Sequence, residues 1–264
     1  MNPHDKHIKT ICKLLRSCGY RYDLHNVFSD CMETAAIALS NSVDHANRDA
    51  REKRYLDIVG RYERDVVEIF PQVLAEIVLA LEAEPGDVLG AVFAELGLKS
   101  ATRGQFFTPY DICRAMAEMT LGDTEKLAEL IERNGFVRAS EPACGAGAMI
   151  IALAEAMRAR GINYQQYLHV TAVDIDPCAV HMAYIQLTLM HIPAVVIVGN
   201  SLSMEMRECW YTPAHILGGW STKLARREAE DAARALLNPP SDSTAKDTSA
   251  EAGTDELPRQ LRFF

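Results

Sequence analysis

The stretch Glu141-Pro142-Ala143-Cys144-Gly145-Ala146-Gly147-Ala148-Met149 decides the fold of this chain. It follows the short apolar run Phe136-Val137, which is typical of a strand, and it leads into a helical pattern from Met149 to Met157. Two glycines at such a strand-to-helix turn let the backbone turn tightly and approach a ligand, and the amides at the helix N-terminus face the same ligand. The stretch therefore predicts a nucleotide-type cofactor loop in an open α/β sheet.

A second acidic turn supports this interpretation. Asp174-Ile175-Asp176-Pro177 follows the apolar run 170–173, so Asp174 ends a second strand and would accept hydrogen bonds from two ribose hydroxyls. The third glycine position of a dinucleotide fingerprint holds Ile150, which argues against a nicotinamide cofactor. The alternative, an ordinary tight turn between strand and helix, is weakened by the acidic residue at the second strand end.

Residues 1–103 are predicted to form a helical N-terminal domain, because apolar residues recur at spacings of three and four. One helix is predicted to carry a stripe of Tyr55, Val59, Tyr62, Val66 and Ile69, a second to cover 73–81, and a third to start after Pro85. We interpret Tyr55 and Tyr62 as core residues rather than as a base-stacking platform, because they share the apolar stripe.

Residues 104–238 are predicted to form an α/β domain, because short apolar runs alternate with helical patterns as in a βαβαβ unit whose third strand covers 194–198. Such a unit places its loops at the carboxyl ends of parallel strands, where the cofactor crevice lies. Residues 239–264 contain few apolar residues before their last few positions, which predicts a disordered tail with an aromatic tip.

The composition limits the class of protein. A chain of 264 residues with 48% hydrophobic residues can bury a sizeable core in one or two domains. Its 7 cysteines include no C-x-x-C pair, which favours free thiols in a reducing cytoplasm and no metal site. Neither a signal-peptide pattern nor an apolar run of membrane-spanning length occurs, so we expect a soluble cytoplasmic protein.

The net charge of −9 argues against tight nonspecific binding of DNA by the whole surface. Basic residues gather in two clusters that are interleaved with Asp and Glu, which favours solvated helix faces with internal ion pairs. The clusters are Arg48, Arg51, Lys53 and Arg54, and Lys223, Arg226, Arg227 and Arg234.

Four segments in a fixed order carry a resemblance to a known family. They are Gly104-Gln105-Phe106-Phe107-Thr108-Pro109, Glu141 to Gly147, Ala172 to Pro177, and Gly199-Asn200-Ser201-Leu202. Together they resemble the motifs of adenine-specific DNA methyltransferases, of the kind found as modification subunits of type I restriction systems and as compact phage or mobile-element relatives. The resemblance implies a Rossmann-like parallel sheet and S-adenosylmethionine as the cofactor.

The resemblance also implies roles for individual residues. Phe107 and Thr108 would contact the methionine end of the cofactor, and Asp174 would bind its ribose. Asn200 would lie beside its adenine, where the family commonly has Asp. The loop that would wrap the middle of the cofactor comprises Glu141, Ala143, Cys144, Gly145 and Gly147.

The acceptor side of the predicted site departs from the family pattern. The family places an Asn or Asp, two prolines and an aromatic residue soon after its adenine-contacting turn, and these bind the flipped base. The corresponding place here holds Tyr211, Thr212 and Pro213 without a carboxamide, and we expect these residues to substitute for the motif. The alternative is the literal match Asn238, Pro239 and Pro240, which precedes the tail.

The short remainder after Leu202 leaves one sheet edge unfinished, and we expect the segment 210–237 or a partner chain to cover it. The C-terminal residues 260–264 resemble ligands of the bacterial sliding clamp, and the alternative is that they fold back onto the sheet edge.

Three functions stay open. The first is a restriction-modification DNA adenine methyltransferase, which could take its sequence specificity from another subunit. The second is a degenerate methyltransferase fold that acts as a regulatory, anti-restriction or DNA-associated module through a partner. The third is an RNA or protein methyltransferase.

Overall fold

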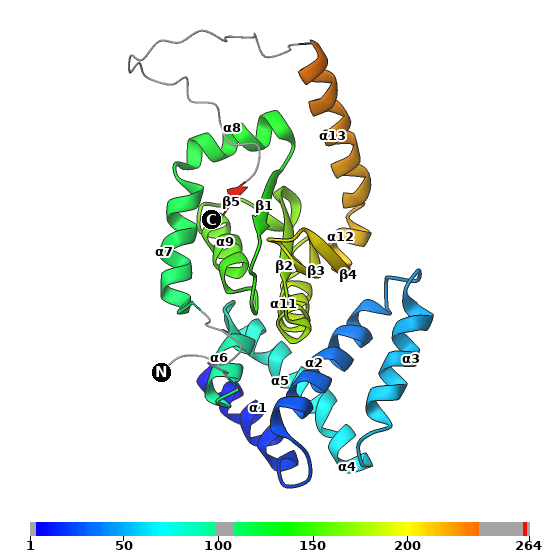
Figure 1. Cartoon of the computed structure of the whole chain (residues 1–264). Helices are drawn as coiled ribbons and strands as arrows, with labels where there is room; N and C mark the ends of the chain where they lie inside the picture. The colour runs from blue at the N-terminus through cyan, green and yellow to red at the C-terminus, as the bar shows by residue number, and fades with distance from the viewer. Residues whose placement is uncertain (1–3, 99–107, 238–260, 263–264) are drawn as a thin grey trace.

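The computed structural model describes residues 4–98, 108–237 and 261–262 (Figure 1). The first of these ranges forms α1 (Asp5–Cys18), α2 (Leu24–Ser40), α3 (Arg48–Val59), α4 (Arg64–Val67), α5 (Ile69–Ala83) and α6 (Val88–Glu95). The helical N-terminal region is therefore confirmed. None of the described helices is both long and apolar enough to cross a lipid bilayer.

The predicted helical stripe from Tyr55 to Ile69 is wrong in one respect, because the structure interrupts it. Helix α3 ends at Val59, and α4 and α5 begin after a turn. Tyr62 lies in this turn, where its hydroxyl donates a hydrogen bond to Asp30 on α2 at 2.7 Å. Both tyrosines are partly buried against the apolar core, as expected for core residues.

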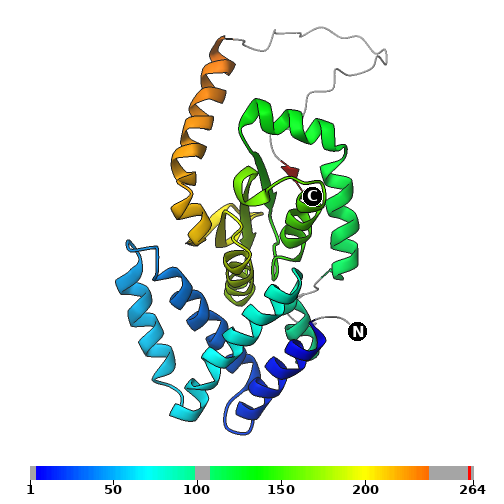
Figure 2. The ribbon, with the colours of Figure 1, turned by 180° about the vertical axis from the view of Figure 1, so that it is seen from behind.

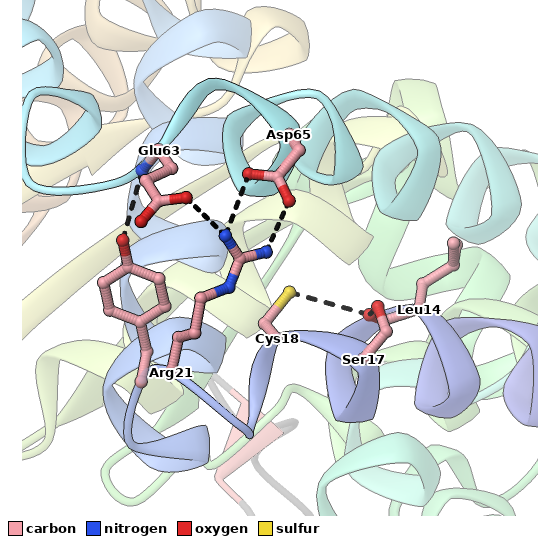
Figure 3. A network of polar contacts seen from close by, with 7 residues as sticks. Leu14, Ser17, Cys18, Arg21, Glu63 and Asp65 are labelled. Atoms are coloured by element: carbon pink, nitrogen blue, oxygen red, sulfur yellow. Dashed lines mark hydrogen bonds and ion pairs between the residues drawn. The ribbon is translucent and has the colours of Figure 1, made fainter.

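Arg21, in the turn between α1 and α2, fixes the position of the α4 N-terminus (Figure 3). Its guanidinium pairs with both Glu63 and Asp65, and the Tyr22 hydroxyl accepts a hydrogen bond from the Glu63 backbone N–H at 3.2 Å. Exposed ion pairs of this kind each contribute only about 0–1 kcal/mol. They therefore specify where the turn lies more than they stabilise the fold.

The second part of the chain alternates helices with strands. The helices are α7 (Tyr110–Leu121), α8 (Thr124–Asn134), α9 (Ala148–Ala159), α10 (Tyr164–Tyr167), α11 (Pro177–Leu189), α12 (Pro213–Leu217) and α13 (Trp220–Leu237). The strands are β1 (Val137–Glu141), β2 (Leu168–Asp174), β3 (Ala194–Asn200), β4 (Glu205–Tyr211) and β5 (Leu261–Arg262). They form one sheet in the order β4-β3-β2-β1-β5, and β1, β2 and β3 are parallel. The α/β fold class with a Rossmann-like parallel core is confirmed, and the predicted tail lies outside the described residues apart from β5.

The two sheet edges are completed differently from the sequence-based expectation. Strand β4 covers the free edge of β3 and runs antiparallel to it, so the edge is not left to segment 210–237 alone. The sequence gives little sign of this strand because its first four residues, 205–208, are exposed and do not alternate in polarity. At the other edge, β5 pairs parallel with β1 through Ala139 and Ser140. This pairing agrees with the fold-back alternative for the C-terminal residues, of which 260, 263 and 264 lie outside the described part.

Helix α11 joins the two parts of the chain. Every residue from Cys178 to Leu187 is buried, because the helix lies between the sheet and the N-terminal helices (Figures 1 and 2). Apolar side chains of α1, α2, α5 and α6 belong to the same buried cluster as those of α9, α11 and the sheet. The predicted domain boundary at residue 103 falls outside the described residues and stays a prediction.

Arg51 ties the N-terminal helices to β4. Its Nη1 lies 2.6 Å from an Asp44 carboxylate oxygen and also bonds the Ser40 hydroxyl. Its Nη2 donates to the Cys209 carbonyl at 3.0 Å, and its guanidinium lies 4.1 Å from the centroid of the Trp210 ring. Only 7% of either charged side chain is exposed. Arg51 is therefore a buried structural cation rather than part of the solvated face predicted for its cluster.

Replacing Arg51 should destabilise the protein strongly. Arg51→Ala leaves the Asp44 carboxylate buried without its cation, and breaking a buried pair in this way costs about 3–5 kcal/mol. The matched control is Arg64→Ala, because the Arg64 side chain is 93% exposed and pairs with Glu68 one turn along its helix. It should cost less than about 1 kcal/mol. Urea unfolding measures both, and equal losses would contradict the structural role of Arg51.

Candidate cofactor site

Three polar side chains meet at the carboxyl ends of the parallel strands. Glu141 ends β1, Asp174 ends β2 and Asn200 ends β3. Register pairing places these ends side by side, since Glu141 lies opposite Ala172 on β2 and Asp174 lies opposite Val198 on β3. The sequence-based expectation of a crevice at this edge is matched by the arrangement of these strands.

The turn from β1 to α9 has the backbone shape that the two glycines predict. Gly145 has a φ of 52° and Gly147 a φ of 95°, both in the left-handed region that side chains other than glycine rarely adopt. Gly147 precedes α9 directly, and a Cβ at this position would lie 3.5 Å from Ala183 on α11. The loop therefore packs close to α11 while its amides turn toward the strand ends.

Strand β2 anchors this glycine loop, which we define as residues 142–147. The Cys144 N–H donates to the Val173 carbonyl at 2.9 Å, and the Gly145 N–H donates to Asp174 Oδ2 at 2.8 Å. Asp174 Oδ1 accepts a second hydrogen bond from the Asp176 N–H at 2.9 Å. Burial raises the pKa of the Asp174 carboxyl, and the two backbone hydrogen bonds oppose this shift. Asp174 therefore shapes the loop in addition to any contact with a ligand.

Glu141 presents an unpartnered oxygen beside the loop. The residue is only 1% exposed, and its Oε1 accepts from the Ala143 N–H at 3.1 Å. Its Oε2 is buried and has no hydrogen-bond partner among the described residues. Burial raises the pKa of this carboxyl, against the hydrogen bond from Ala143. Since a buried acceptor without a partner is costly, this oxygen fits a ligand that brings a hydrogen-bond donor or a cation.

Asn200 and Ser201 form the turn at the carboxyl end of β3, beside the glycine loop. Asn200 Oδ1 accepts hydrogen bonds from the Leu202 N–H at 3.0 Å and the Ser203 N–H at 3.3 Å. The Ser201 hydroxyl donates to the Pro142 carbonyl at 2.7 Å. The turn after β3 is therefore fastened to the glycine loop, and the carboxamide oxygen of Asn200 is already engaged in shaping this turn.

The predicted cofactor residues before α7 are only partly described. Phe107 lies outside the described residues, whereas Thr108 is exposed immediately before α7. The Thr108 carbonyl accepts from the Cys113 thiol at 3.8 Å, and α7 packs along α9 (Figure 1). Thr108 therefore lies two residues before a helix that packs against the helix following the glycine loop.

Gln186 contacts the glycine loop and also bonds Asp87, and no sequence pattern had selected either residue. Gln186 Nε2 donates to the Ala146 carbonyl at 2.8 Å and to Asp87 Oδ1 at 3.0 Å. Its Oε1 accepts from the Leu89 N–H at 3.0 Å. The available signal was a single amide inside the otherwise apolar stretch 182–187, because a buried amide needs polar partners.

The structure does not bring Tyr211, Thr212 and Pro213 to the crevice. Strand β4 runs antiparallel to β3, so Tyr211 pairs with Val195 at the amino end of the parallel strands. Thr212 is buried, and its hydroxyl accepts from the Ala194 N–H at 2.9 Å. The reversal of direction carries these residues to the opposite end of the sheet from Glu141, Asp174 and Asn200, where Thr212 caps α12.

The alternative catalytic residues Asn238, Pro239 and Pro240 lie outside the described residues. Helix α13, which precedes them, begins with Trp220, whose ring lies 5.1 Å from that of Phe136 and 5.3 Å from that of His169 between centroids. Both partners stand at the amino ends of their strands, so α13 starts on the side of the sheet away from the glycine loop. Within the described ranges, no group of three or more His, Cys, Asp or Glu side chains could hold a metal ion.

Replacing Gly147 should destabilise the loop through its backbone. Gly147→Ala forces a side chain into a conformation with φ of 95°, where the left-handed region costs about 1–2 kcal/mol. The control Gly19→Ala lies at a helix C-cap with φ of −67°, so it carries no left-handed penalty. Its Cβ would lie 3.3 Å from the Arg16 carbonyl, which offsets the usual gain of about 0.4–1 kcal/mol at a compatible φ, so the protein should not lose the stability that Gly147→Ala loses. Urea unfolding compares the two variants, and an unchanged Gly147→Ala protein would mean that the loop has another shape.

Comparison with known families agrees with this geometry. A sequence model described as N-6 DNA methylase matches residues 86–241, which is more than half of the chain and includes α6, the glycine loop and the sheet through β4. No curated protein and no solved structure matches the chain. The chain belongs to the N-6 DNA methylase family.

Proposed function

We propose that this chain is an S-adenosylmethionine-dependent DNA methyltransferase that acts on the adenine amino group. The observation that carries the proposal is the meeting of Glu141, Asp174 and Asn200 around the glycine loop, at the carboxyl ends of three adjacent parallel strands. This is where an open α/β sheet binds a nucleotide cofactor. The family match spans this whole arrangement.

The residues present fit such a cofactor. The buried Glu141 Oε2 has no partner among the described residues and would accept a hydrogen bond from the cofactor's ammonium group. Asp174 keeps further lone pairs on both oxygens, which would accept from the ribose hydroxyls. Thr108 and its neighbour Phe107, which lies outside the described residues, would contact the methionine end, and Asn200 would lie beside the adenine.

Methyl transfer depends on the relative position of the methyl donor and the acceptor nitrogen more than on acid or base groups. The bound cofactor supplies an activated methyl group on a sulfonium, and the protein has to hold an acceptor nitrogen in line with it. An adenine inside a duplex cannot reach that position unless the base is extruded from the stack. The glycine loop with Glu141, Asp174 and Asn200 would hold the methyl donor in this arrangement.

We expect the group that binds the target adenine to come from outside the described residues. Tyr211, Thr212 and Pro213 lie at the opposite end of the sheet, which argues against the role expected for them. Two sources remain: Asn238, Pro239 and Pro240 of this chain, or a partner chain. The same observation favours a second function, in which the chain binds the cofactor and acts as a regulatory or anti-restriction module without transferring a methyl group.

A role in restriction-modification, with sequence specificity supplied by another subunit, is part of the proposal and rests on the family resemblance. Docking of residues 260–264 to a sliding clamp would compete with the pairing of Leu261 and Arg262 with β1. The backbone pairing of β5 with β1 supports the intramolecular arrangement.

Cofactor binding should depend on Asp174. Asp174→Ala should weaken S-adenosylmethionine binding about ten- to a hundredfold, because a hydrogen bond to a charged acceptor contributes about 1.5–3 kcal/mol. Asp123→Ala is the control, since Asp123 is exposed and its side chain makes no capping hydrogen bond at α8. Isothermal titration calorimetry measures the affinities. Equal affinity of the Asp174→Ala and parent proteins would remove the ribose assignment.

Methyl transfer separates the two functions. With tritiated S-adenosylmethionine and duplex DNA free of methylated adenine, the parent should yield N6-methyladenine after digestion to nucleosides. Tyr211→Phe should retain transfer within about twofold, because a change that touches neither reactant leaves transition-state binding unaltered. Cofactor binding without any transfer would reject the enzymatic proposal and favour the regulatory module. Loss of methyl transfer in Asn238→Ala, with S-adenosylmethionine binding intact, would mean that this chain itself supplies the group that binds the target adenine.

A further inference from the structure

Gln186 is the polar centre of a contact between the N-terminal helices and the glycine loop. It lies on α11, is 0% exposed, and uses both ends of its carboxamide. The oxygen accepts from the Leu89 N–H at 3.0 Å, and the nitrogen donates to Asp87 Oδ1 at 3.0 Å. The second proton of that nitrogen goes to the Ala146 carbonyl at 2.8 Å. One buried side chain thus links α6 to the loop.

The α6 side of this contact is built around the Asp87 carboxylate. Asp87 is the N-cap of α6, and its Oδ1 also accepts from the Gly90 N–H at 2.9 Å. A Cβ on Gly90 would lie 2.0 Å from Asp87 Oδ2, so the carboxylate occupies the space that a side chain would need. Burial raises the pKa of Asp87, and its hydrogen bond from Gln186 opposes this shift. The turn therefore needs an acceptor oxygen at position 87 that also receives a donor from α11.

The loop side of the contact fixes the peptide between the two left-handed glycines. Ala146 lies between Gly145 and Gly147, which both have positive φ. Because glycine can adopt many backbone conformations, the peptides around Ala146 need hydrogen bonds to fix their orientation. The Ala146 carbonyl and the Gly147 N–H belong to one planar peptide unit. That N–H donates to the Cys144 carbonyl at 2.8 Å, so the hydrogen bond from Gln186 holds the unit from its other side.

We propose that Gln186 is a positioning residue that holds the glycine loop in its cofactor-binding shape and, through Asp87, makes this shape depend on the N-terminal helices. The proposal rests on the proposed function where it concerns cofactor affinity. It does not rest on that function where it concerns the order of the loop itself. Helix α6 is then a supporting part of the cofactor site rather than a neighbouring scaffold.

If Gln186 had only a structural role, its replacement would lower stability and cofactor affinity together. A second change at Asp87 separates the two effects. Gln186→Glu removes both donated hydrogen bonds and sets a carboxylate against Asp87 and the Ala146 carbonyl. Adding Asp87→Asn removes the negative charge that faces the new carboxylate, and Asn serves equally well as an N-cap that accepts from the Gly90 N–H. In the double variant the charge repulsion at α6 is relieved, whereas the Ala146 carbonyl still lacks its donor.

The experiment compares the full-length parent, Gln186→Glu, the double variant Asp87→Asn/Gln186→Glu and the control Gln72→Glu. Gln72 is exposed, and its amide donates to the Glu68 carbonyl. Three readouts are taken: thermal unfolding, S-adenosylmethionine affinity by calorimetry, and amide hydrogen exchange of residues 143–147 without cofactor. The control should match the parent in all three.

We expect the double variant to regain part of the thermal stability that Gln186→Glu loses, because one of the two facing negative charges is removed. Its cofactor affinity should stay about tenfold below that of the parent, the equivalent of one ordinary hydrogen bond, and its loop amides should exchange faster. A double variant with the affinity and loop exchange of the parent would overturn the proposal. If the parent itself does not bind S-adenosylmethionine, the proposed function fails, and loop exchange alone still decides the role of Gln186.

Discussion

The hydrogen bond from the Gly145 N–H to Asp174 Oδ2, at 2.8 Å, is the contact on which the site depends. Left-handed glycines make the loop flexible in principle, so its shape has to come from partners outside it. Asp174 supplies one from β2, Ser201 supplies another from the β3 turn, and Gln186 supplies a third from α11. These partners come from distant parts of the sequence, so the loop can take its shape only in the assembled fold.

The antiparallel direction of β4 determines which described residues reach the carboxyl end of the parallel strands. A parallel strand after β3 would return the chain to the crevice, whereas the antiparallel hairpin takes it to the amino edge of the sheet. There the buried Arg51 holds the Cys209 carbonyl and the Trp210 ring, so the hairpin is locked against the N-terminal helices. Among the described residues, the polar strand ends Glu141, Asp174 and Asn200 therefore lie at one end of the sheet and Tyr211, Thr212 and Pro213 at the other.

The sequence predicted those parts of the molecule that local patterns encode. The glycine turn and the strand end at Asp174 were located from residue type and period, because φ requirements and apolar runs are local properties. Asn200 was selected through the family resemblance, and the third strand, predicted to end at 198, extends to Asn200. Strand β4 was missed because an exposed edge strand shows no clear alternation. The role of Gln186 was missed because its partners lie far from it in sequence. Both failures concern contacts between segments that no local sequence pattern connects.

The most direct test of the account is a crystal structure of the chain with bound S-adenosylhomocysteine, the product of methyl transfer. The account predicts that the ribose hydroxyls lie within hydrogen-bonding distance of Asp174, that the ammonium group faces Glu141 Oε2, and that the glycine loop keeps its hydrogen bond to Gln186. A ligand bound elsewhere, or a loop that leaves Asp174 and Gln186 when the ligand binds, would contradict it.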